Sequence, residues 1–241
     1  MNAKIAIMVG LALLSMSCSQ RVDNFIELSM SVFDEPESVL LTREEVSALN
    51  YAAQYLHIDG KHRLLAPLNQ ALGARLTWRV GSYQFIHTQH GRVVASDSLP
   101  SMPMQTSPLE NDPLQCLRKR DQNQQCGKNW LRQIVWQSQQ NSELSYQRIW
   151  VHSSLERDSQ PEPITLLNGQ VLSVYRIVES GQWLPADDLS HPIAFENTFW
   201  QHIESGRVVK TRQFLSPQLG YLQSEEVVPY SGDINYQSNS L

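Results

Sequence analysis

Short segments in which apolar and polar residues alternate constrain this chain more than any other feature. The clearest segment runs from Ala74 to Ala95, where Leu76, Trp78 and Val80 alternate with polar residues and a His90-Gly91 turn follows. Such alternation places one side of a strand in a core and the other side in solvent. Similar segments recur along the chain with turns between them. The sequence therefore predicts a mainly β protein, an antiparallel β-sandwich or barrel-like body.

Four further pairs of strands follow from the same pattern. They are a hairpin around Asp59-Gly60, strands at 130–136 and 146–151, a hairpin over 164–177 that turns at Asn168-Gly169, and strands at 199–203 and 208–214 joined at Ser205-Gly206. Asp-Gly and Asn-Gly turns are strong local hairpin signals. The segment 99–127 is rich in Pro, Ser, Asn and Gln and is predicted to be a long loop.

One short helix is predicted near the N-terminal end of this body. Thr42-Arg-Glu-Glu45 forms a capping box, and Val46 and Leu49 follow at helical spacing. No composition change divides the rest of the chain. We therefore expect a single mainly-β domain over residues 42–241, preceded by a tether over residues 18–41.

The N-terminus has the pattern of a lipoprotein signal peptide. Lys4 precedes an apolar run over residues 5–14, and small or uncharged residues lead directly into Cys18. The run is about half of the roughly 20 residues that a helix needs to cross a bilayer, so residues 1–17 are predicted to be cleaved. Lipidation of Cys18 with diacylglycerol and palmitate would anchor the chain stably. The alternative is an ordinary secretory signal cut near Ser17 or Ser19.

The residue after Cys18 indicates the cellular compartment, and the net charge limits the kinds of partner. Ser19 follows the cysteine, whereas Asp at that place normally retains lipoproteins in the inner membrane, so we expect the periplasmic side of the outer membrane. The whole chain has a formal charge of −5. Residues 1–17 carry one Lys and no acid, which leaves the remaining chain near −6. A chain of this charge without a basic stripe is not expected to bind nucleic acid.

The two remaining cysteines form an even pair. Cys116 and Cys126 are predicted to form a disulfide in an oxidising periplasm. The bond would close a polar loop and stabilise the fold by about 2–3 kcal/mol. A metal site would need more ligands than two thiols.

No catalytic, metal or cofactor motif stands out in the sequence. A nucleophile elbow, a phosphate-binding glycine loop, a zinc-protease helix and a calcium loop are all missing. His87 and His90 would lie on opposite faces of a strand unless the turn begins at Thr88. His57 and His62 flank the Asp59-Gly60 turn, but two ligands do not make a site. We interpret these histidines as surface or turn residues and predict neither a metal nor a cofactor.

Acidic pairs and aromatic residues leave a second function class open. The acidic pairs at 44–45, 187–188 and 225–226 are interpreted as solvated surface. A glycosidase needs two carboxylates across a cleft, which a sequence does not show. The aromatic residues are interpreted as core rather than as platforms for sugars. A periplasmic glycan-active hydrolase or lyase therefore stays the alternative to a non-enzymatic partner protein.

Several motifs in a fixed order carry a family resemblance. They are Thr42-Arg-Glu-Glu45, Leu76-Thr-Trp78, His90-Gly91-Arg92-Val93-Val94, Asp112-Pro113-Leu114, Asn197-Thr-Phe-Trp200, Arg212-Gln213 after Ser205-Gly206, and Pro229-Tyr230. Together they resemble the YjbF/GfcB family of capsule and exopolysaccharide lipoproteins. The chain departs from that pattern at Val209, where an aromatic residue is common, and in the insert between Cys116 and Cys126.

The resemblance implies a non-enzymatic accessory role in export or assembly of capsule, O-antigen capsule or exopolysaccharide. The implied partners are a YjbH/GfcD-like outer-membrane β-barrel, a GfcC/YjbG-like periplasmic protein and the polysaccharide itself. Trp200, Arg212 and Gln213 are expected to serve the fold or a partner surface rather than catalysis. If the turn centres near Ser205-Gly206, Trp200 and Arg212 lie nearly opposite and can stack.

Overall fold

The computed structural model describes residue 33 and residues 38–118, 126–140, 143–185 and 191–232. These ranges contain thirteen strands and two short helices. In chain order the elements are α3 (Arg43–Ala48), β1 (Ala53–Ile58), β2 (Arg63–Leu72), β3 (Arg75–Arg79), β4 (Phe85–Gln89), β5 (Arg92–Asp97), β6 (Pro103–Ser107), α4 (Pro113–Arg118), β7 (Asn129–Gln140), β8 (Glu143–Arg157), β9 (Glu162–Thr165), β10 (Val171–Pro185), β11 (Ile193–His202), β12 (Val208–Ser216) and β13 (Gly220–Val228).

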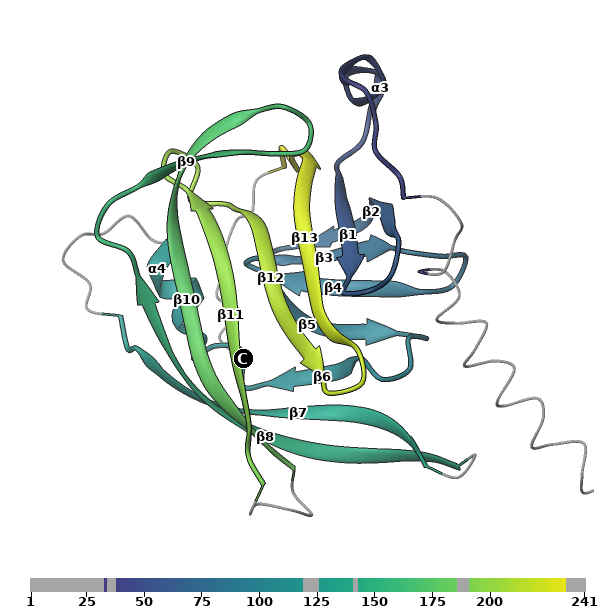
Figure 1. The fold of residues 1–241 in the computed structure, drawn as a ribbon, viewed down its shortest axis with the longest axis vertical. Helices are drawn as coiled ribbons and strands as arrows, with labels where there is room; N and C mark the ends of the chain where they lie inside the picture. The colour runs from purple at the N-terminus through teal and green to yellow at the C-terminus, as the bar shows by residue number, and fades with distance from the viewer. Residues whose placement is uncertain (1–32, 34–37, 119–125, 141–142, 186–190, 233–241) are drawn as a thin grey trace, which may run out of the picture.

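All thirteen strands belong to one antiparallel sheet that curls into a nearly closed barrel (Figure 1). Twelve strands follow the order β5-β4-β3-β2-β1-β13-β12-β11-β10-β8-β7-β6, and β9 pairs with β10 beside this path. The two end strands meet at Ser96, whose Oγ donates to Pro103 O at 2.8 Å. The predicted mainly β, antiparallel, barrel-like body with a short N-terminal helix is confirmed.

The local signals of the sequence produce the expected elements. Thr42 caps α3 through a capping box in which Thr42 N donates to Glu45 Oε2 at 2.8 Å. Hairpins form around Asp59-Gly60, His90-Gly91 and Asn168-Gly169. Gly91 and Gly169 adopt φ values of 85° and 82°, where a side chain would be strained. Short-range turn chemistry therefore determines these hairpins.

The predicted long loop at 99–127 is wrong in part, because β6 and α4 lie within it. β6 is polar and short, and its pairing partners on β7 lie 26 to 33 positions further along the chain. A third strand, β13, also follows the pair predicted at 199–214. It lies between β1 and β12 in the sheet. β6 depends on this long-range pairing, whereas β13 forms a tight hairpin with β12, in which Ser216 lies opposite Gly220.

Part of the segment expected to be a tether contacts the body. Val39 N donates to Arg63 O at 2.9 Å, and Leu41 N donates to the Tyr55 hydroxyl at 2.8 Å. Phe33 is fully buried within the cluster that lines β1 to β5. These residues therefore belong to the packed structure. Within the described residues, no helix is long and apolar enough to cross a membrane.

The barrel interior beside β7, β8, β10 and β11 is built in three layers. One apolar layer contains Ile134, Trp136, Ile149, Val151, Trp183 and Phe195. The other apolar layer contains Leu114, Leu155, Ile177 and Phe199. On each of the four strands a polar residue lies between these layers, namely Arg132, Ser153, Glu179 and Asn197. This middle layer is the most unusual feature of the interior.

Candidate functional site

Glu179 lies at the centre of the middle layer and is 0% exposed. Its carboxylate accepts four hydrogen bonds from four different strands. The donors are Arg92 Nη1 at 2.6 Å, Arg132 Nη1 at 2.7 Å, Ser153 Oγ at 2.7 Å and Asn197 Nδ2 at 2.7 Å. One side chain of β10 thus joins β5, β7, β8 and β11 inside the barrel.

Arg92 extends this network to α4. Its Nε donates to Asp112 Oδ2 at 2.7 Å, and its Nη2 donates to Asp112 Oδ1 at 3.2 Å. Asp112 Oδ1 also accepts from Leu114 N at 2.9 Å, at the beginning of α4. A planar guanidinium facing a carboxylate in this two-point arrangement is the strongest common form of ion pair.

The indole of Trp130 lies beside both guanidinium groups. Its ring centroid is 4.8 Å from Arg92 Cζ and 4.4 Å from Arg132 Cζ. Phe199 approaches Arg92 Cζ at 5.0 Å. Two arginines face two carboxylates, so the network is formally neutral. Burial of charge is costly unless the charges are paired and hydrogen-bonded, and here they are both.

Electrostatics keep Glu179 and Arg92 ionised, whereas burial lowers the pKa of Arg132. Burial opposes ionisation of Glu179, but Arg132 and Arg92 outweigh it and hold the pKa of Glu179 well below its ordinary value. Burial also opposes the charge of Arg92, yet Asp112 and Glu179 raise the pKa of Arg92. A general acid or base needs a pKa near the working pH and access to the substrate. Glu179 has neither, so the network can stabilise the fold but is unsuited to proton transfer.

Gln213 forms a second polar connection across the barrel. Its Oε1 accepts from Val93 N at 3.0 Å, and its Nε2 donates to Gly91 O at 2.9 Å. These bonds tie β12 to the beginning of β5. Gly91 is required there, because a Cβ atom at this position would lie 2.6 Å from Val208. Asn197, which also bonds to Glu179, links β11 to β12 through its Oδ1, which accepts from Phe214 N at 2.7 Å.

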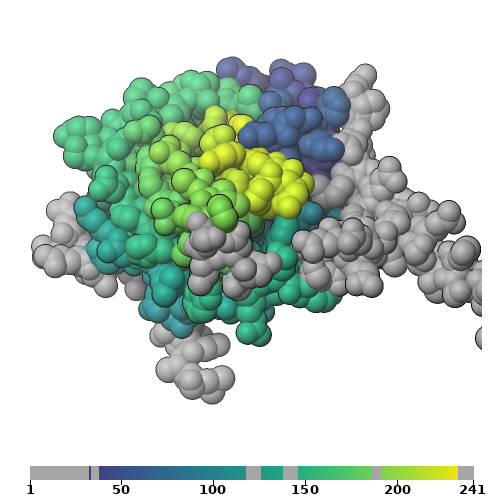
Figure 2. Space-filling view, turned by 60° about the horizontal axis from the view of Figure 1, so that its bottom comes forward, coloured from purple at the N-terminus to yellow at the C-terminus, as the bar shows by residue number. Residues whose placement is uncertain are grey.

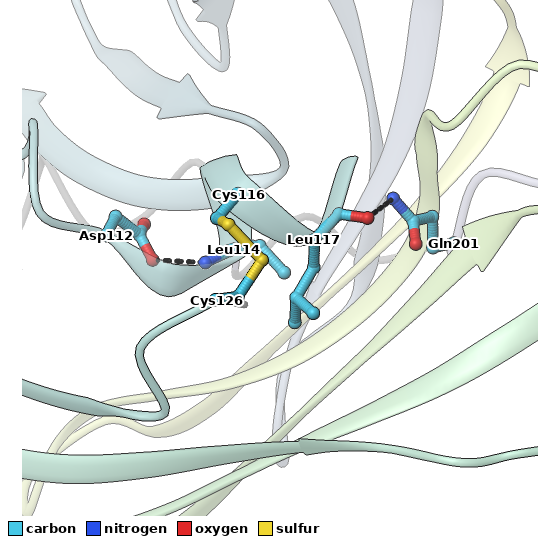
Figure 3. Close-up of a disulfide and its surroundings, with 6 residues drawn as sticks. All are labelled: Asp112, Leu114, Cys116, Leu117, Cys126 and Gln201. Carbon is cyan, nitrogen blue, oxygen red and sulfur yellow. Dashed lines mark hydrogen bonds between the residues drawn. A yellow bond between two sulfur atoms is a disulfide. The ribbon is translucent and has the colours of Figure 1, made fainter. Parts of the chain in front are cut away.

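A disulfide holds the short helix α4 beside the network (Figure 3). Cys116 and Cys126 are bonded with an S–S distance of 2.04 Å and a Cα–Cα distance of 5.6 Å. Leu114 is buried between the strands, and Leu117 O accepts from Gln201 Nε2 at 3.5 Å. The bond thus links α4 to the segment that enters β7.

The predicted stacking of Trp200 on Arg212 is wrong. Trp200 lies opposite Lys210, whose Nζ is 5.8 Å from the ring centroid. Arg212 lies opposite Thr198 and places its Cζ 3.4 Å from the ring centroid of Tyr221. The pairing is displaced by two residues from the predicted register. Of the three predicted residues, Gln213 is buried in the barrel, whereas Trp200 and Arg212 are half-buried.

The other candidate residues do not form a site together. His87 bonds to Thr77 Oγ1 at 2.9 Å and to Asp97 Oδ2 at 2.8 Å. No group of three or more His, Cys, Asp or Glu side chains suitable for a metal occurs in the described ranges. Glu225 was expected on the solvated surface, but it is buried, where it binds Lys210 Nζ at 2.8 Å and accepts from Leu167 N. Cys18 and Asp187-Asp188 lie outside the described residues.

Sequence reasoning missed Arg132 and Glu179. Each lies in phase with the apolar residues of its strand, Arg132 between Trp130 and Ile134, and Glu179 after Ile177. A charged residue at an inward position of an alternating strand is the signal that could have identified them. It is informative because charged side chains are rarely buried unless they are paired.

The motifs of the sequence converge on this network. Arg92, Asp112, Asn197 and Gln213 come from four separate motif segments, and all four are buried around Glu179 or at the β5–β12 contact. Segments that are far apart in the chain thus share one place in the fold.

Comparison with protein families identifies the family of this chain. The profile of the family described as group 4 capsule polysaccharide lipoprotein gfcB, YjbF matches residues 26–227. The chain belongs to the YjbF family. Its relatives in this family are named as capsule polysaccharide lipoproteins, which gives the chain a lipoprotein and capsule context. No curated protein sequence matches the chain.

This member of the YjbF family shares its fold with a protein of known structure. The chain is similar to the crystal structure of the hypothetical lipoprotein YmcC from Escherichia coli (K12), with a TM-score of 0.63 and 18% sequence identity. The similarity covers 79% of this chain and 90% of that one. At this identity the likeness establishes the fold.

Proposed function

We propose that this chain is an outer-membrane lipoprotein, anchored through Cys18 on the periplasmic side, that acts as a non-enzymatic accessory in export or assembly of a surface polysaccharide. The polysaccharide would be capsule, O-antigen capsule or exopolysaccharide. The family membership over residues 26–227 is the observation that carries the proposal. Residues 1–17 would be the signal peptide that directs the chain to lipidation.

The interior of the barrel supports a role by contact rather than by catalysis. The most elaborate polar arrangement is the Glu179 network, in which the carboxylate is fully buried and all its bonds go to other side chains of the chain. A catalytic carboxylate must instead reach the substrate. The network therefore suits a rigid body that presents surfaces to partners.

The proposed partners are a YjbH/GfcD-like outer-membrane β-barrel and a GfcC/YjbG-like periplasmic protein. The same family membership motivates them, and a lipid anchor would hold this chain at the surface where such a barrel resides. Restoring a tagged lipidated protein to the producing strain should allow co-purification of the barrel.

Deletion of the chain tests the proposal. Loss of the protein should reduce surface polysaccharide while sugar-nucleotide precursors and undecaprenyl-linked repeat units remain, because export would fail after synthesis. Complementation with the wild-type chain is the control. Normal surface polysaccharide in the deletion strain would contradict the proposal. Turnover of the purified polymer by the purified protein would instead support a glycan-active hydrolase or lyase.

A further inference from the structure

The outer face of the β7–β8 hairpin carries unusual side chains for a water-exposed sheet. The two strands pair without a register shift from Asn129 opposite Ser154 to Gln140 opposite Glu143. Ile134 and Trp136 of β7 point into the barrel, as do Ile149 and Val151 of β8. Because side chains alternate along a strand, the residues between them face outward. Figure 2 turns the side of Figure 1 that carries these strands toward the viewer.

Six outward residues form what we call the aromatic strip. They are Gln133, Val135, Gln137, Tyr146, Arg148 and Trp150. Tyr146 is 64% exposed and Trp150 is 41% exposed, although both are large rings. None of the six side chains forms a hydrogen bond or ion pair with another described residue. Exposed aromatic surface of this kind marks interaction sites.

The strip repeats itself along the hairpin. Trp150 lies opposite Gln133, and Tyr146 lies opposite Gln137, so an aromatic ring beside an amide occurs twice. The two pairs are four residues apart, which corresponds to about 13 Å along a strand. Arg148 and its neighbour Val135 lie between them. A repeated pair of ring and amide suits a ligand that itself repeats, such as a chain of sugars.

The charge of the strip points to the same kind of ligand. Residues 131–137 and 146–152 contain Arg132 and Arg148 and no acid, and of these two only Arg148 faces outward. The whole chain, in contrast, carries a formal charge of −5. An acidic polymer would be repelled by much of the protein but attracted at Arg148. Amides and a guanidinium can bond to hydroxyl and carboxylate oxygens, while the rings pack on sugar faces.

We propose that the aromatic strip binds a segment of an acidic polysaccharide, with Trp150 and Tyr146 packed on sugar rings and Arg148 paired with an acidic substituent. The inference rests on the proposed function, because it takes the family's capsule context as the source of the polymer. It names a surface of this chain that would contact the exported material directly. β6 pairs with β7 over Gln133–Trp136 and β10 pairs with β8 over Ile149–Arg157, so Trp150 lies on a flanked part of the sheet. Tyr146 and Arg148 lie beyond the β10 pairing, on the projecting end of the β7–β8 hairpin.

Binding of the purified surface polysaccharide of the producing strain tests the inference. The probe is titrated into detergent-solubilised full-length protein, with dextran as the neutral control polymer. Trp150→Ala and Tyr146→Ala should each weaken binding about five- to tenfold. Arg148→Ala should weaken binding and reduce its dependence on salt. Tyr83→Ala is the matched control, because Tyr83 is 80% exposed on the turn between β3 and β4, outside the strip. It should bind like the wild type.

The outcomes separate this inference from the proposed function. All variants must first show the wild-type unfolding temperature, as expected for exposed positions. Wild-type affinity of Trp150→Ala and Tyr146→Ala would overturn the inference, as would an equal loss in Tyr83→Ala. The purified wild-type protein could bind no polymer although the deletion strain still loses its surface polysaccharide. In that case the strip inference is wrong and the proposed function stands. If strip variants lose only the co-purified outer-membrane barrel, the strip is a protein interface and the inference is again wrong.

Discussion

Arg132 Nη1 lies 2.7 Å from Glu179 Oε1 inside the barrel, although the two residues are 47 positions apart in the chain. Arg92, 87 positions from Glu179, approaches the same carboxylate from the opposite end of the strand order at 2.6 Å. One buried carboxylate thus bonds to two arginines from distant strands, and Asp112 supplies the second negative charge. The stability of the closed barrel should therefore depend on Glu179.

Replacement of Glu179 by Gln should destabilise the protein strongly. The variant keeps the size of the side chain but leaves two buried guanidinium groups with too little negative charge. Removing one partner of a buried ion pair costs about 3–5 kcal/mol. Urea unfolding followed by tryptophan fluorescence measures this change. Glu196→Gln on β11 is the control, since Glu196 is exposed and should tolerate the change. Equal stability of the two variants would contradict a stabilising role of the network.

The same carboxylate should make stability depend on acid pH. Glu179 has a pKa lowered well below its ordinary value in the folded protein. A lowered folded-state pKa adds stability that is complete above the unfolded pKa, about 4.3 for Glu, and is lost as the pH falls toward the folded value. The difference in unfolding free energy between wild type and Glu179→Gln should therefore be constant above about pH 5 and shrink below about pH 4. A difference that grows on acidification would have the wrong sign.

Alanine substitutions at Gln213 and Arg212 should differ sharply in their effect on stability, although the two residues are neighbours. Gln213→Ala removes partners of Val93 N and Gly91 O in the barrel interior, which should cost about 1–3 kcal/mol. Arg212→Ala removes a contact with Tyr221 from a side chain that is 42% exposed, which should cost about 0.5–1 kcal/mol. Thermal unfolding of both variants compares them. A larger loss in Arg212→Ala would show that the surface contact matters more than the interior bonds.

Cys116 and Cys126 should contain no free thiol in protein isolated from the periplasm. Intact-mass analysis after alkylation without reductant should detect no label, and the same sample should gain two labels after reduction. Cys116→Ser should lower the free energy of unfolding by about 2–3 kcal/mol, because α4 and the strand entry lose their covalent link. Two labelled thiols in unreduced material would contradict the bond.

Cys18→Ser should release the protein from the membrane fraction. The substitution removes the sulfur atom that lipid would modify. Fractionation and metabolic labelling with a fatty-acid analogue measure the effect, with Cys116→Ser as the cysteine control that should remain labelled. Unchanged labelling of Cys18→Ser would show that the lipid is attached elsewhere or that the signal is an ordinary secretory one.

The sequence by itself determined the class of the fold and most of its local elements. Alternating apolar residues predicted strands, and a Thr-x-x-Glu box predicted α3, because both depend on neighbours within a few residues. The hairpin turns at Asp59-Gly60 and Asn168-Gly169 followed from the freedom of glycine at positive φ. The family motifs were also visible, since each is a short contiguous segment.

Only the tertiary structure decided which of these segments meet. The pairing of Trp200 with Lys210 depends on a register shift in β11–β12 that no local residue signals. The burial of Arg132 and Glu179 depends on closure of the barrel, because a charged residue in an alternating strand is stable inside only when distant strands supply its partners. Interactions between neighbours in the chain can be read from a sequence, whereas those between strands 47 and 87 residues apart require the fold.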